Sequence, residues 1–96
     1  MSEILEPLNV IIKKDQKEGN LMAFDCDTRC NKGNVWSIDK TGSCEASYEF
    51  YRETIVPSKE EVAEFKAYLE KAYDCVINVR RKFSNKDLSY IWSDVS

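Results

Sequence analysis

The N-terminal half of the chain alternates apolar and polar residues with a period of two, as a β-strand does. Residues 8–13, 21–27 and 35–39 each place apolar side chains at every second position, and residues 44–53 give the clearest alternation. Asn and Gly residues, which favour tight turns, separate these segments. We therefore predict an antiparallel meander of three or four strands within residues 8–54.

The C-terminal half changes to a helical period. Ser58 followed by Glu61 has the spacing of a capping box, and apolar residues recur at helical spacing from Val62 onward. We predict one long helix over about residues 58–84, whose apolar side covers the sheet face that carries Trp36, Tyr48 and Phe50. The tail, residues 85–96, fits either a short helix or a strand.

Length and composition fit one globular α+β domain spanning residues 1–96. The chain is 43% hydrophobic and 32% charged, with three Gly and two Pro. It contains no His, which removes the usual general base and every His-ligated metal site. Its glycines are isolated, so no glycine-rich phosphate loop is present. The sequence therefore argues against an enzyme and against a bound cofactor.

The four cysteines do not form the two close pairs that structural zinc sites usually show. Only Cys26 and Cys30 are close in sequence, whereas Cys44 and Cys75 lie far along the chain. We expect free thiols and no metal site. The first residues lack the basic start and long apolar run of a secretory signal, and no segment approaches about 20 apolar residues. The expected location is the cytoplasm, with no membrane contact.

The predicted sheet face turned away from the helix concentrates acidic residues with few balancing cations. A negative surface of this kind attracts a protein partner with a basic surface and speeds its capture. An exposed Tyr on the same face supplies an anchoring aromatic side chain. The residues predicted to bind this partner are Asp25, Asp27, Asp39, Glu45, Glu49, Tyr51 and Glu53.

A second hypothesis rests on basic residues at the predicted C-terminal end of the long helix. Arg80, Arg81, Lys82 and Lys86 would bind the phosphates of a nucleic acid in a regulatory module. The helix dipole alone favours cations at the C-terminal end of a helix. In addition, no aromatic residue lies between these basic residues to stack on bases. The net charge of −3 further favours a protein over a nucleic acid as partner.

The sequence thus predicts a small, acidic, non-catalytic protein-binding domain. The expected activity is inhibition, in which the domain occludes a larger nucleic-acid enzyme or a toxin. Immunity proteins and the accessory proteins of viruses and mobile elements share this size and charge, a similarity of composition that transfers no residue roles. A homodimer is compatible with either hypothesis.

Overall fold

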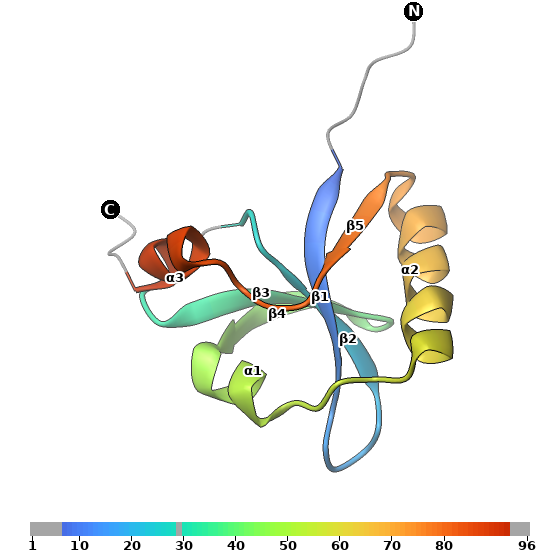
Figure 1. Cartoon of the computed structure of the whole chain (residues 1–96), viewed down its shortest axis with the longest axis horizontal. Helices are drawn as coiled ribbons and strands as arrows, with labels where there is room; N and C mark the ends of the chain where they lie inside the picture. Colours follow the sequence, from blue (N-terminus) through green and yellow to red (C-terminus); the bar gives the residue numbers. More distant parts are fainter. Residues whose placement is uncertain (1–6, 29, 93–96) are drawn as a thin grey trace, which may run out of the picture.

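The computed structural model describes residues 7–28 and 30–92 and shows a five-stranded sheet with three helices (Figure 1). The start of the chain, on which the prediction of no secretory signal depends, and the end of the tail lie outside these ranges. No helix within them is long and apolar enough to cross a bilayer. The elements are β1 (Leu8–Lys14), β2 (Leu21–Asp25), β3 (Asn34–Asp39), β4 (Gly42–Ser47), α1 (Tyr48–Glu53), α2 (Lys59–Tyr73), β5 (Ile77–Arg80) and α3 (Asn85–Ile91).

The sheet has the strand order β4-β3-β2-β1-β5. Strands β1 to β4 form the predicted antiparallel meander, whereas β5 pairs in parallel with β1 at the opposite edge from β4. The chain passes from β4 at one edge of the sheet to β5 at the other through α1 and α2. The α+β class is confirmed, but the sheet is mixed and has a fifth strand that the sequence analysis missed.

Helix α2 covers one face of the sheet and begins where the sequence predicts. The Ser58 hydroxyl accepts a hydrogen bond from the Glu61 amide, and the Glu61 carboxylate accepts one from the Ser58 amide. The apolar side of α2 packs against β1, β2, β3 and β5. The buried residues of this core are Val10, Ile12, Ala23, Ile38, Phe65, Leu69 and Ile77.

The long helix predicted over about residues 58–84 ends at Tyr73. Asp74 takes a left-handed conformation (φ 49°) at the helix C-cap, and its amide donates to the Glu70 carbonyl. The residues that follow are rich in β-branched Val and Ile, which favour a strand, and they form β5. The same apolar residues also fit a helical stripe, so periodicity alone extended the predicted helix through them.

The second face of the sheet is covered by α1 and α3. Ser47 caps α1 by accepting a hydrogen bond from the Phe50 amide, so the strand predicted over residues 44–53 stops at Ser47. A capping box formed by Ser84 and Asp87 begins α3, so the described part of the tail is helical. The buried residues of this second core are Ile11, Met22, Phe24, Val35, Tyr51, Phe83 and Ile91.

Helices therefore lie on both faces of the sheet, as Figure 1 shows, whereas the sequence predicted one covered and one solvated face. The strand register explains the error. Trp36 pairs with Asp25 on one side and with Glu45 on the other, so all three side chains lie on the α2 face. The alternation had placed Trp36 opposite these acids. Tyr48 and Phe50, expected beneath the long helix, lie instead in α1.

Candidate functional site

The three aspartates of the predicted acidic face accept hydrogen bonds from their own chain near the strand ends. Asp25 is 6% exposed, and its carboxylate accepts hydrogen bonds from the Asp27 amide at 2.8 Å and from a neighbouring Thr hydroxyl. Asp27 accepts a hydrogen bond from the Asn9 side chain at 3.0 Å. Asp39 accepts hydrogen bonds from the amide and the hydroxyl of Thr41. The carboxylates of Asp25 and Asp39 therefore shape their turns, whereas the carboxylate of Asp27 is bound by a side chain of β1.

The glutamates of the predicted acidic face do not extend that surface. Glu45 in β4 accepts hydrogen bonds from the Asn34 side chain at 3.0 Å and from the Asn31 amide at 2.7 Å, and these bonds lower the pKa of its carboxyl group. Glu49 and Glu53 are exposed, but they lie in α1, which covers the face opposite to α2. The glutamates therefore lie on two different sides of the sheet.

Tyr51, predicted to be an exposed anchor, is 9% exposed. Its ring packs 5.0 Å from that of Phe24 and 4.8 Å from that of Phe83, between ring centroids. Burial raises the pKa of its phenol group. The expected exposure of Tyr51 is therefore wrong. The partner-binding role of the seven residues stays a prediction, but they do not share the single face from which it was derived.

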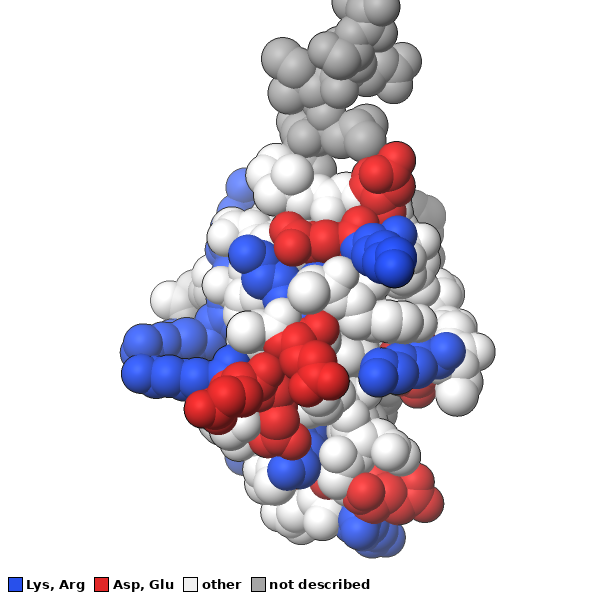
Figure 2. Space-filling model, turned by 90° about the vertical axis from the view of Figure 1, so that its right-hand side faces the viewer, with Lys and Arg blue, Asp and Glu red and all other residues white. Residues whose placement is uncertain are grey.

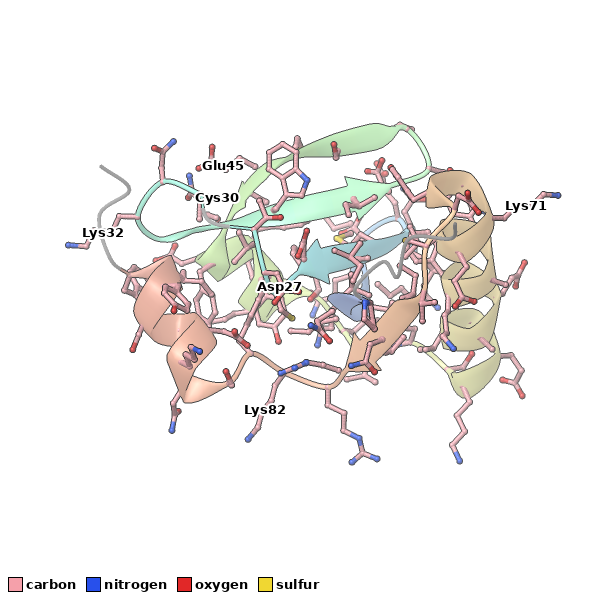
Figure 3. The ribbon with its side chains drawn as sticks, turned by 90° about the horizontal axis from the view of Figure 1, so that it is seen from above. Asp27, Cys30, Lys32, Glu45, Lys71 and Lys82 are labelled. Atoms are coloured by element: carbon pink, nitrogen blue, oxygen red, sulfur yellow. The ribbon has the colours of Figure 1, made fainter. Side chains whose placement is uncertain are left out.

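The basic residues of the second hypothesis lie at the β5 edge and beyond it, not at the C-terminal end of one long helix. Arg80 ends β5, Arg81 and Lys82 lie in the bend that follows, and Lys86 lies in the first turn of α3. All four residues are exposed. In Figure 3, Lys82 points away from the sheet on the side where β5 is the outermost strand.

Arg80 and Arg81 border a groove that runs between β5 and the N-terminal half of α2. The groove has a volume of about 830 Å³. Among the described residues that line it, five are cationic, seven are aliphatic and one is Asn, and none is acidic. The lining consists of Lys13, Lys59, Lys66, Arg80 and Arg81 together with Ile12, Val56, Pro57, Val62, Ala63, Ile77, Asn78 and Val79.

The positive charge of the groove is not neutralised from within the described part of the chain. None of its five cationic residues forms an ion pair there; the ion pair nearby joins Lys14 to Glu61 at 3.0 Å. Burial lowers the pKa of Lys13, whose ammonium lies 5.6 Å from the centroid of the Tyr51 ring. Close to an apolar surface, charges interact more strongly than in bulk water. The groove is therefore locally positive in a chain of net charge −3.

On the side of the molecule formed by α2 the two signs of charge are mixed. Figure 2, which shows the side of the molecule formed by α2, has acidic and basic side chains interspersed over the whole view. Such mixing is typical of a solvated surface and gives no field of one sign. The segregation of cations around an apolar floor therefore distinguishes the β5 groove.

The outer edge of β5 also leaves part of its backbone unpaired. The Leu8 amide donates to the Val76 carbonyl at 2.8 Å, so the even-numbered residues of β5 direct their backbone groups toward β1. Ile77 and Val79 therefore direct theirs outward. The Glu70 carboxylate accepts a hydrogen bond from the Ile77 amide at 3.3 Å. No residue in the described ranges hydrogen-bonds to the outward backbone groups of Val79.

A second cavity, of about 510 Å³, lies between the β2–β3 loop and α3 and is lined in part by Cys26 and Cys30. Its charged lining mixes three Asp with one Arg and one Lys. Burial raises the pKa of the Cys26 thiol to about 12 and also raises that of Cys30, so both thiols are protonated and poorly nucleophilic near neutral pH. All four cysteines are free, and the described residues contain no group of His, Cys, Asp or Glu side chains arranged to hold a metal.

Sequence reasoning identified Arg80 and Arg81 but missed the other cations of the groove. Lys59 and Lys66 are seven residues apart, and this spacing places them on the same side of a helix. That signal was available. No local signal connects them with Lys13, because Lys13 reaches the groove only through the pairing of β1 with the strand that the analysis missed.

Comparisons with known proteins identify no relative for this chain. No protein family, curated protein or solved structure matches it. The proposal that follows therefore rests on the geometry of the groove.

Proposed function

We propose that this protein is a non-catalytic protein-binding module that captures an acidic segment of a larger protein in the β5 groove. The observation that carries this proposal is the lining of five cationic residues and no acidic residue around an aliphatic floor. The cations attract carboxylates and set the partner's charge. The floor gains about 25 cal/mol for each Å² of apolar surface that the segment buries on it.

The groove favours a peptide over a single-stranded nucleic acid. None of its lining residues is aromatic, whereas proteins that bind single strands stack bases on aromatic side chains for about 1–3 kcal/mol per base. Seven of its lining residues are aliphatic and offer a phosphate backbone nothing to bind. Two copies of this chain are not expected to pair groove to groove, because each copy would bring five cations to the contact.

This proposal keeps the predicted protein-binding role and changes the sign of the binding surface. The predicted acidic site required a solvated sheet face, and helices cover both faces. Inhibition by occlusion of a nucleic-acid enzyme or toxin stays a prediction. A module that holds an acidic segment of its target inhibits the target only if that segment is needed for activity.

The test measures the binding of two short peptides by fluorescence anisotropy. Each peptide has about seven residues, longer than the four-residue strand β5, and alternates Val with either Glu or Lys. We expect the Glu peptide to bind and the Lys peptide not to bind. Equal affinity for both peptides would contradict the proposal, because the cations would then contribute nothing to recognition.

A matched pair of double variants locates the site. Lys66→Glu with Arg81→Glu reverses one cation on each wall of the groove and should weaken binding of the Glu peptide about tenfold or more. Lys32→Glu with Lys71→Glu changes the net charge by the same amount. Both of these side chains point away from the molecule in Figure 3 and neither lines the groove. Equal weakening by the two double variants would show attraction to net charge only.

A further inference from the structure

We infer that the captured segment binds as a sixth strand, paired with the outer edge of β5, and that acidic and apolar residues alternate along it. This inference rests on the proposed function and specifies how the segment is held. An unpaired strand edge offers a row of amide and carbonyl groups to any extended chain, and the surfaces beside it select alternate side chains.

The hydrogen bonds of β5 indicate where the added strand pairs. The amide and carbonyl of Val79 point away from β1 and have no partner in the described part of the chain. The Ile77 carbonyl points the same way, whereas the Ile77 amide is already held by Glu70. The segment therefore pairs with the second half of β5, next to Arg80, and Glu70 limits pairing at the first half.

On the α2 side the floor of the groove is apolar, although Lys59 and Lys66 of α2 also line it, whereas the opposite side of the β5 edge carries Arg80 and Lys13; this difference predicts the alternation. Val62 of α2 and the side chain of Val79 lie together in the apolar core on the α2 side. Arg80 pairs with Ile11, so its side chain lies on the opposite face, as does that of Lys13 by alternation along β1. Successive side chains of an added strand point to these two sides in turn, so apolar residues meet Val62 and acidic residues meet Arg80 and Lys13.

The charge of this edge determines what kind of strand it accepts. Cations on an edge strand discourage pairing between copies of the same protein, because like charges would be brought together. The five cationic residues around the β5 edge have this effect on a second copy of the chain and the opposite effect on an acidic strand. The edge is therefore blocked to self-association and open to a partner of opposite charge.

The test follows the exchange of backbone amides by NMR, with and without the peptide that alternates Glu and Val. At saturating peptide we expect the exchange of the Val79 amide to slow by about tenfold or more, because it gains a hydrogen bond. The Arg80 amide, which faces β1 in both states, serves as the internal control. If the peptide binds and the Val79 amide exchanges at an unchanged rate, strand addition is wrong and the proposed function stands. If the peptide does not bind at all, the proposed function is wrong as well.

Modified peptides test the same inference without altering the protein. N-methylation of one peptide amide at a time should weaken binding at every second position, because alternate amides face β5. An equal effect at all positions would contradict strand addition. A peptide of the same composition with its Glu and its Val residues in two separate blocks should bind about tenfold more weakly. Equal affinity for this block peptide would contradict the alternation.

Discussion

The two edges of the sheet expose their backbone in different chemical surroundings. At one edge, β4 is mostly exposed and polar, and Glu45 accepts hydrogen bonds from Asn31 and Asn34. At the other edge, β5 is bordered by aliphatic residues and by cations that form no ion pair in the described structure. Both edges are short, which limits aggregation. The carboxylate of one edge is satisfied internally, and the cations of the other remain available to a partner.

This contrast shows why the total charge of the chain is a poor guide to its binding surface. The net charge of −3 suggested an acidic site. Asp25, Asp39 and Glu45, however, accept hydrogen bonds from their own turns or loops. Within the part of the chain that the structure describes, the cations around β5 have no carboxylate partners, so the groove is positive although the protein as a whole is negative.

The largest expected effect is on the free energy of unfolding, and it compares a proline placed where the β5 amide faces β1 with one placed where the amide faces outward. Arg80→Pro removes an amide that faces β1 and should lower the free energy of unfolding by about 2–4 kcal/mol. Val79→Pro removes an outward amide, which an edge strand tolerates, and should cost clearly less. Urea denaturation of both variants provides the measurement. Equal losses, or a larger loss for Val79→Pro, would contradict the assignment of the outward edge.

A smaller effect is expected from salt, and it should differ between the two kinds of edge contact. Raising the salt concentration from about 0.05 to 0.5 M should weaken binding of the Glu-Val peptide about tenfold, because screening acts on the exposed cations of the groove. The hydrogen bonds to Glu45 join exposed groups in direct contact, at 2.7 Å from Asn31 and 3.0 Å from Asn34, so the difference in melting temperature between the wild type and Glu45→Gln should change less with salt than the peptide affinity does. A salt-independent peptide affinity would mean that the cations do not contribute.

The smallest effect concerns the β4 edge and acid pH. Hydrogen bonds from Asn34 and Asn31 lower the pKa of Glu45 below the usual glutamate value of 4.5. Its contribution to stability is therefore fully present above pH 4.5 and is lost as the pH falls through the lowered pKa of the folded state. Glu45→Gln should be less stable than the wild type at neutral pH, and the difference should shrink in acid. A difference in melting temperature that stays constant from neutral to acid pH would show that the charge of Glu45 is unimportant.

Local signals predicted the fold where local chemistry determines it. The Ser58–Glu61 capping box marked the start of α2, and alternation located β1, β2 and β3. The sequence patterns predicted the ends of the strands and helices less well than their starts. Residues 48–53 alternate like a strand but form α1, because Ser47 caps a helix and Tyr51 is buried against Phe24. Such a choice depends on tertiary packing, which a window of sequence does not contain.

The candidate site was only partly visible for the same reason. Arg80 and Arg81 stand out as a basic run, and they do border the groove. Its apolar floor and Lys13 depend on the parallel pairing of β1 with β5, two strands separated by more than half of the chain. The predicted acidic residues do not share one face of the sheet. Their faces were inferred within each strand separately, without the pairing between strands, and a shift of one residue in that pairing moves a side chain to the other face.

The most direct test of the central claim is to map the bound peptide on the wild-type protein. Titration of the Glu-Val peptide into isotope-labelled protein, followed through backbone amide chemical shifts, locates the contact without any substitution. We predict that the largest shifts fall on Lys66, Val79 and Arg81, on the two walls of the groove. Shifts confined to the β4 edge or to the cavity beside α3, or no shifts at all, would contradict the claim that the β5 groove is the binding site.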